Sequence, residues 1–252
     1  MPKKNLFTII VLIVILGFTA NAQTPPPAKQ TMVIVHGAWG GAWAFKKVDA
    51  MLQAKGFEVY RPQLTGQGDR VHLARGDIGL TTHIDDVVNT ILYEDLRDIV
   101  LVGHSYGGMV ITGVADRVPD RIKRLVYLDA IVPADGDSVS TLLGRGDFIK
   151  QMTKGDFIVP PWVKPDQPPP HDVPQSLKTF TDRIVLKNEA ARKIPATYIL
   201  TVEKDKEPKD DDFFSQSVRA KERGWTMLQL TSDHNPQWSA TEALVDMLAS
   251  IR

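Results

Sequence analysis

Apolar runs recur along the chain and predict strands that alternate with helices. Continuous, β-branched apolar segments predict six buried strands, at 31–35, 57–60, 98–102, 125–128, 197–202 and 226–230. Between them apolar residues recur at helical spacing and predict helices, among them 42–55, 82–92, 109–115 and 239–250. Such alternation produces a parallel sheet covered by helices on both faces. We therefore predict an α/β fold with a mainly parallel six-stranded sheet.

The stretch from about 131 to 190 interrupts this alternation. It is rich in proline, and large apolar residues are scattered through it: Phe148, Met152, Phe157, Trp162 and Phe180. It lies between two predicted core strands, at the carboxyl edge of the sheet, where ligands bind in such folds. We expect a cap inserted after the strand that ends near Asp129. A disordered insertion is the alternative, and the aromatic residues argue against it.

The first residues have the pattern of a leader. Lys3 and Lys4 precede an apolar stretch at 6–18, and Ala20-Asn21-Ala22 has the form of a cleavage site. A membrane-spanning helix needs about 20 apolar residues, so a retained anchor is the weaker alternative. We predict a signal peptide at 1–22, an extended lead-in at 23–30 and one domain at 31–252. The protein would then be periplasmic or secreted, with no stable membrane association after cleavage.

Composition narrows the classes of partner. The 30 basic residues balance the 30 acidic ones, and no basic stripe suggests nucleic-acid binding. The chain has no cysteine, so an exported form would be held by its core without disulfides. Neither composition nor pattern predicts the oligomeric state.

The segment Gly103-His104-Ser105-Tyr106-Gly107 is the strongest functional motif. It follows a predicted strand and precedes a predicted helix, which is the context of a nucleophile elbow. Glycines on either side of the serine relieve collisions and tolerate strained dihedral angles in so sharp a turn. Ser105 is therefore the candidate nucleophile.

A serine nucleophile needs a base and a group that orients the base. His234 lies in the loop between the last strand and the last helix, at the carboxyl edge of the sheet. The acid is expected after a late strand, in the chain order serine, acid, histidine. We predict Asp205, which follows strand 197–202; Asp129, at the end of strand 125–128, is the competitor. Since the base must be neutral, we expect activity to fall in acid while the fold persists.

The remaining histidines are given other roles. His104 lies within the elbow, is expected to point away from the nucleophile and is predicted to be structural. His72, His83 and His171 are interpreted as surface or cap residues. No histidine and carboxylate spacing fits a metal site, so no metal is predicted.

The glycine-rich segment 36–41 follows the first predicted strand and suits an oxyanion hole. We expect its Ala38 N–H and the Tyr106 N–H to stabilise the oxyanion. Phosphate binding is the alternative, but both phosphate-binding glycine motifs are absent. Candidate pocket residues are His36, Gly37, Trp39 and Trp162.

The chain resembles the α/β-hydrolase superfamily in four segments: HGAWGGAW at 36–43, GHSYGG at 103–108, YLDAIVP at 127–133 and SDH at 232–234. The resemblance extends over essentially all of the chain after the leader. It is greatest to the branch of plant methyl esterases, hydroxynitrile lyases and bacterial carboxylesterases. It implies a triad of Ser105, Asp205 and His234, with Ala38 and Tyr106 as the oxyanion hole.

Two departures from that branch favour hydrolysis over cyanohydrin cleavage. The lyases have a threonine and a lysine where this chain has Gly37 and Asn235. We therefore expect a serine hydrolase that cleaves a small carboxylic ester through an acyl-enzyme and needs no cofactor. A lyase-like reaction on the same fold and a ligand-binding protein with a vestigial triad are the alternatives.

Overall fold

A computed structural model describes residues 29–144, 146–164 and 166–251. The predicted signal peptide at 1–22 lies outside these residues, as does most of the lead-in at 23–30. Within the described residues, no helix is long and apolar enough to cross a membrane.

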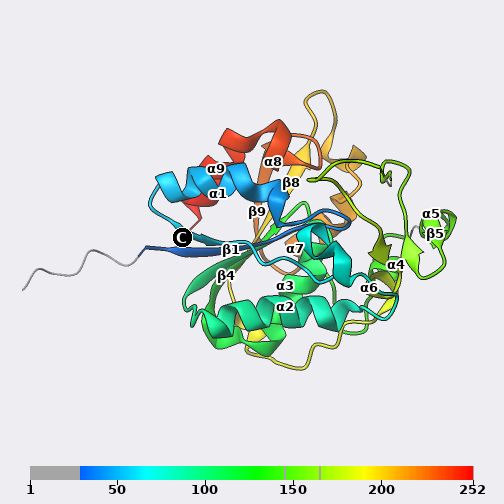
Figure 1. Cartoon of the computed structure of the whole chain (residues 1–252). Helices are drawn as coiled ribbons and strands as arrows, with labels where there is room; N and C mark the ends of the chain where they lie inside the picture. The colour runs from blue at the N-terminus through cyan, green and yellow to red at the C-terminus, as the bar shows by residue number, and fades with distance from the viewer. Residues whose placement is uncertain (1–28, 145, 165, 252) are drawn as a thin grey trace, which may run out of the picture.

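Six parallel strands form the central sheet (Figure 1). Their order is β2-β1-β3-β4-β8-β9, and their bounds are β1 Thr31–Val35, β2 Glu58–Tyr60, β3 Ile99–His104, β4 Ile122–Leu128, β8 Ala196–Val202 and β9 Thr226–Thr231. The prediction of a six-stranded parallel α/β sheet is confirmed.

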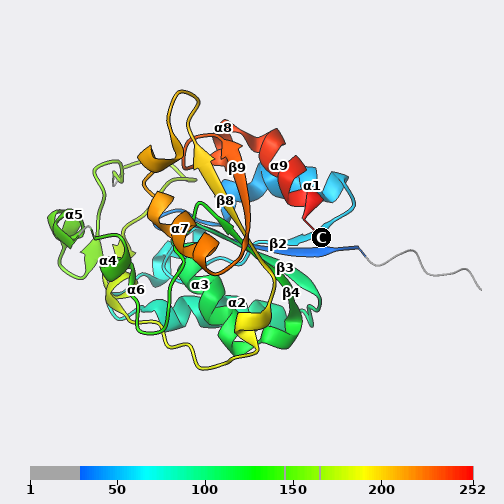
Figure 2. The same cartoon turned by 180° about the vertical axis from the view of Figure 1, so that it is seen from behind.

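Side chains that alternate along the strands pack into two apolar cores, one on each face of the sheet. Met32 and Ile34 of β1 pack with α1 (Lys46–Ala54) and α9 (Thr241–Ser250), whereas Val33 and Val35 pack with helices on the opposite face. Figure 2 shows α2 (Leu80–Tyr93), α3 (Gly107–Arg117) and α7 (Phe214–Glu222) on that second face. Because both faces are covered, the central strands β1, β3 and β8 are buried at every position and are mainly apolar rather than alternating.

Short elements complete the described fold. The 3₁₀ helices are η1 Ala42–Phe45, η2 Gly68–Leu73, η3 Pro119–Arg121, η4 Ala191–Lys193 and η5 Pro208–Asp210, and α8 is Pro236–Ser239. The helix predicted at 42–55 is thus divided into η1 and α1, and the one predicted at 239–250 begins two residues later.

The segment between β4 and β8 folds outside the main sheet, beside the carboxyl ends of its strands (Figure 1). It contains α4 (Val139–Leu142), α5 (Gly146–Met152), α6 (Lys178–Thr181) and a three-stranded antiparallel sheet of β5 (Thr153–Lys154), β6 (Phe157–Ile158) and β7 (Gln175–Ser176). Met152 and Phe180 are buried, whereas Trp162 is half exposed. We call residues 131–190 the cap segment.

Candidate active site

Ser105 lies in the tight turn between β3 and α3. Its φ of 56° is in the left-handed region, which costs energy for a residue with a side chain. A Cβ added to Gly103 would lie 2.6 Å from the carbonyl oxygen of Gly107, and one added to Gly108 would lie 2.1 Å from that of Ile131. Only glycine fits these two positions, so the turn brings the serine hydroxyl out at the carboxyl edge of the sheet.

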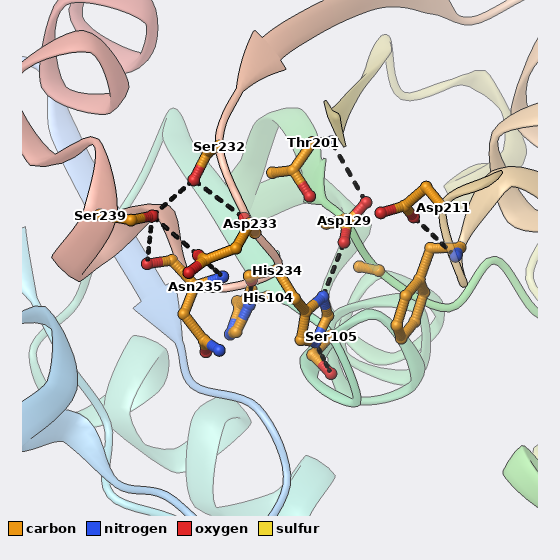
Figure 3. Close-up of polar contacts among 12 residues, drawn as sticks. His104, Ser105, Asp129, Thr201, Asp211, Ser232, Asp233, His234, Asn235 and Ser239 are labelled. Atoms are coloured by element: carbon orange, nitrogen blue, oxygen red, sulfur yellow. Dashed lines mark hydrogen bonds and ion pairs between the residues drawn. The ribbon is translucent and has the colours of Figure 1, made fainter. Parts of the chain in front are cut away.

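His234 contacts Ser105 from the loop after β9. Its Nε2 lies 2.9 Å from Ser105 Oγ, at the distance of a hydrogen bond from the hydroxyl (Figure 3). Phe213 stacks on the imidazole at 4.6 Å between ring centroids, and His104 packs on it at 4.8 Å. These rings hold the plane of His234 toward the serine.

Polar contacts brace the loop that carries His234. Asp233 Oδ1 accepts hydrogen bonds from the Asn235 N–H at 2.8 Å and from Ser239 Oγ at 2.7 Å. Ser232 Oγ lies 2.7 Å from Ser239 Oγ, which ties the loop to the first turn of α8 (Figure 3). The imidazole is therefore positioned by the backbone as well as by its ring contacts.

Asp129 is the carboxylate that orients His234. The His234 Nδ1–H donates to Asp129 Oδ2 at 2.6 Å, and the Thr201 N–H donates to Oδ1 at 3.3 Å (Figure 3). The Asp129 side chain has no exposed surface. A buried carboxylate on Nδ1 places the proton there and leaves Nε2 free to accept the serine proton.

The prediction of Asp205 as the partner of His234 is wrong. Asp205 lies in an exposed turn beyond β8, where its N–H bonds to the carbonyl of Glu203. Asp129 directly follows β4 and has a φ of 43°, which turns its side chain toward the histidine. The competitor from the earlier strand thus occupies the acid position.

A second carboxylate, Asp211, lies close to Asp129 (Figure 3). Its Oδ1 accepts a hydrogen bond from the Phe213 N–H at 2.7 Å. Partial burial, followed by the charge of Asp129, raises the pKa of Asp211 to about 6.

The predicted oxyanion donors lie beside the serine. Gly37 approaches so closely that a Cβ added there would lie 3.0 Å from Ser105 Cβ. Within the described residues, the N–H groups of Ala38 and Tyr106 donate no backbone or side-chain hydrogen bond. Trp39 fixes the loop, since its N–H donates to Gln175 Oε1 and its carbonyl accepts from the Val173 N–H, both at 2.8 Å. Both amides are therefore available to an oxyanion.

A cavity of about 340 Å³ opens over Ser105 and His234. All four candidate pocket residues line it, together with both oxyanion residues. Trp39 packs edge-on against Trp162 at 5.6 Å and obliquely against Phe180 at 5.5 Å. We call residues 36–41 the oxyanion loop. This loop and the cap segment thus form one aromatic wall of the cavity. No group of three or more described histidine or acidic side chains could hold a metal ion.

Comparison with known proteins identifies the family of the chain. Residues 32–247 match the family model described as "Alpha/beta hydrolase family". The chain belongs to the alpha/beta hydrolase family.

Relatives of this α/β-hydrolase include named esterases. A carbendazim hydrolyzing esterase of Nocardioides sp. (strain SG-4G) is 35% identical over 87% of this chain and 98% of its own. The pFDCC methylesterase MES16 of Arabidopsis thaliana is 28% identical over 84% of this chain and 90% of its own. The predicted resemblance to plant methylesterases and bacterial esterases is confirmed, and so is the class of carboxylesterase-type hydrolase.

A solved structure shares the fold. It is an extracellular α/β-hydrolase from a Paenibacillus species, described as sharing structural and functional homology with tobacco salicylic acid binding protein 2. The TM-score is 0.73 at 23% identity, over 87% of this chain and 98% of the other.

Two further histidines of this α/β-hydrolase, His104 and His36, hold the loops of the site through hydrogen bonds. His104 Nε2–H donates to the carbonyl of His234 at 2.8 Å, in agreement with its predicted structural role. His36 Nδ1–H donates to the carbonyl of Gly37 at 2.8 Å. Burial lowers the pKa of His36 to about 4 and that of His104 to about 3, so both act as neutral hydrogen-bonding groups.

The interpretation of His83 as a surface or cap residue is wrong. His83 is fully buried on α2, where Nδ1 lies 2.9 Å from the Tyr106 hydroxyl and Nε2 lies 3.0 Å from the carbonyl of Thr65. A signal was present, since residue 83 falls on the same helical face as Leu80 and Val87. His72 is exposed and His171 is partly buried in the cap segment.

Proposed function

We propose that this protein is a serine hydrolase that cleaves a small carboxylic ester through an acyl-enzyme, with Ser105, His234 and Asp129 as its triad. The continuous hydrogen-bond chain from Ser105 Oγ to the buried Asp129 carboxylate carries the proposal. It meets the requirements for a nucleophile, a base and an orienting acid.

The reaction would run in two steps. Ser105 Oγ attacks the ester carbonyl while His234 Nε2 takes the hydroxyl proton, and the N–H groups of Ala38 and Tyr106 stabilise the oxyanion. The intermediate collapses with cleavage of the C–O bond, and His234 gives the proton to the departing alcohol. His234 then takes a proton from a water molecule, which attacks the acyl-enzyme. The bond to Ser105 Oγ breaks, the free acid leaves, and His234 gives the proton to Ser105 Oγ. No step requires a cofactor.

The names of the relatives suggest the first substrates to test. These are carbendazim and methyl esters, with aromatic ones first because Trp39, Trp162 and Phe180 line the cavity. Purified wild type should hydrolyse short p-nitrophenyl esters and at least one of these substrates, and a fluorophosphonate should add to Ser105. Ser105→Ala should lose both activities with an unchanged melting temperature. Retained turnover in Ser105→Ala would refute the mechanism, and cyanide release from mandelonitrile would favour the lyase alternative.

Export is a separate part of the proposal. It rests on Lys3 and Lys4, the apolar stretch 6–18 and Ala20-Asn21-Ala22. Mass spectrometry of the protein from its native host should find a mature chain that begins at Gln23 in the periplasm or medium. A chain that begins at Met1 in the membrane fraction would contradict it.

A further inference from the structure

The wall of the catalytic cavity contains acidic side chains. Two carboxylates, Asp172 and Asp212, line the cavity over Ser105, whereas its described lining contains no lysine or arginine. Asp172 belongs to the cap segment and is partly buried. A partly desolvated carboxylate inside a substrate cavity favours ligand groups that donate hydrogen bonds or carry positive charge.

Asp172 is held in a fixed place. Its Oδ2 accepts a hydrogen bond from Trp162 Nε1 at 3.1 Å. The next residue, Val173, donates its N–H to the carbonyl of Trp39 at 2.8 Å and so ties this strip of the cap to the oxyanion loop. The Asp172 carboxylate is therefore positioned relative to the donors that would hold the reacting carbonyl.

The second oxygen of Asp172 faces the oxyanion loop. A Cβ added to Gly40, itself a lining residue, would lie 3.7 Å from Oδ1. The hydrogen bond from Trp162 goes to Oδ2, and no described side chain donates a hydrogen bond to Oδ1. Burial raises the pKa of Asp172 despite the hydrogen bond from Trp162 and the neighbouring His171, as expected for a carboxylate that has lost part of its water.

We propose that Asp172 determines substrate specificity, its Oδ1 accepting a hydrogen bond from an N–H or ammonium group of an aromatic ester. This inference rests on the proposed function and names its substrate class: neutral or cationic esters that carry a nitrogen donor. The aromatic wall holds the ring of such a substrate, and Asp172 binds its donor. Esters that carry a second carboxylate are repelled by the same group.

Three matched substrates test the inference. They are p-nitrophenyl esters of 3-phenylpropanoic acid whose ring carries a para aminomethyl, methyl or carboxylate group. Wild type should hydrolyse the ammonium ester with a kcat/KM roughly 10- to 100-fold above that of the methyl ester, as a charge-assisted hydrogen bond implies. The carboxylate ester should be the poorest substrate, and the preference for the ammonium ester should weaken in high salt.

Two variants assign the effect to Asp172. Asp172→Asn keeps an acceptor for Trp162 Nε1 but loses the charge, so the ratio of the ammonium to the methyl ester should fall roughly 10-fold or more. Asp166→Asn removes an exposed charge from the same segment, away from the cavity, and should leave the ratio unchanged.

The outcomes separate this inference from the proposed function. Hydrolysis by wild type without preference among the three esters, or an equal loss on all three in Asp172→Asn, would overturn the role of Asp172 alone. A wild type that hydrolyses none of the esters and fails to react with a fluorophosphonate would overturn the proposed function, and this inference with it.

Discussion

Replacing Asp129 with asparagine tests the acid of the triad. Asparagine has the same shape and tolerates the left-handed φ of 43° at this position. The Thr201 N–H needs an acceptor, so the amide oxygen should take the place of Oδ1. The amide NH₂ then occupies the place of Oδ2 and faces His234 Nδ1. Because Nδ1 must now accept, the imidazole proton moves to Nε2, which can no longer accept the serine proton.

The size of the effect follows from this change of tautomer. A histidine held in the wrong tautomer, without the carboxylate that stabilises its cation, costs about 10³- to 10⁴-fold in kcat. That loss corresponds to about 4 to 5.5 kcal/mol of transition-state stabilisation. KM should change much less, since Asp129 is buried beneath His234 and is not among the residues that line the cavity.

The assay compares two carboxylates, Asp129 and Asp205, in one set of measurements. Steady-state hydrolysis of a p-nitrophenyl ester and the rate of fluorophosphonate labelling should both collapse in Asp129→Asn, with a melting temperature close to that of wild type. Asp205→Asn changes an exposed turn and should stay within twofold of wild type. A slow Asp205→Asn beside a normal Asp129→Asn would refute the assignment of the acid from this geometry.

Three further predictions concern stability. Asp211→Asn should raise the melting temperature at pH 8, because burial and the charge of Asp129 raise the pKa of Asp211 to about 6 and make its charged form unfavourable. Since the side chain is half exposed, removing the charge should stabilise the fold by only about 1 kcal/mol. An unchanged or lower melting temperature would contradict this. Burial lowers the pKa of His36 to about 4 and of His104 to about 3, so unfolding binds protons below pH 6.5. The free energy of unfolding, measured with urea, should therefore fall by up to about 2.7 kcal/mol for each pH unit as the pH is lowered from 6.5 to 4. From pH 4 to 3 only His104 contributes, so the slope should be half as large. A free energy of unfolding that does not change with pH would show that these histidines are not buried. Gly108→Ala should destabilise the fold by about 2 kcal/mol or more, because its Cβ would lie 2.1 Å from the carbonyl oxygen of Ile131. Gly40→Ala is the control: its Cβ would lie 3.7 Å from the nearest atom, so this variant should unfold at the same denaturant concentration as wild type.

The expectation that the fold persists in acid conflicts with these buried histidines. It treated His234 as the one histidine that matters, since a sequence does not show which imidazoles lose water. His104 stands between a strand and the nucleophile in the sequence, yet its burial depends on Phe45 and on the His234 loop. Loss of activity in acid should therefore be accompanied by loss of stability.

The central strands β1, β3 and β8 were predictable because they are completely buried. A parallel strand covered on both faces is apolar at every position, so Thr31–Val35 stands out in the sequence and is observed with the predicted bounds. The nucleophile elbow was predictable for a related reason. Its glycines avoid collisions within one turn of chain, and a local constraint of this kind is visible in a short motif.

The acid was not predictable in the same way, because two strands end close to His234. The chain order serine, acid, histidine fits both Asp129 and Asp205. The place after a late strand and the resemblance favour Asp205, but only the backbone after each strand decides which carboxylate reaches the imidazole. One signal did favour Asp129: it lies among apolar residues, between Leu128 and Ala130. A carboxylate in such a context is buried, and a buried carboxylate needs a partner.

The histidines around Ser105 differ in burial, and their roles differ accordingly. A site with one proton acceptor must keep neighbouring imidazoles from competing for the proton or repelling the cation that forms on His234. Burial keeps His36 and His104 neutral, so they can hold the loops of Gly37 and His234 through single N–H donors without adding charge. His234 has 35% of its side chain exposed and carries the contact to Asp129. Solvent access and the contact to a buried carboxylate thus distinguish His234, the base of the proposed mechanism, from the two neutral imidazoles beside it.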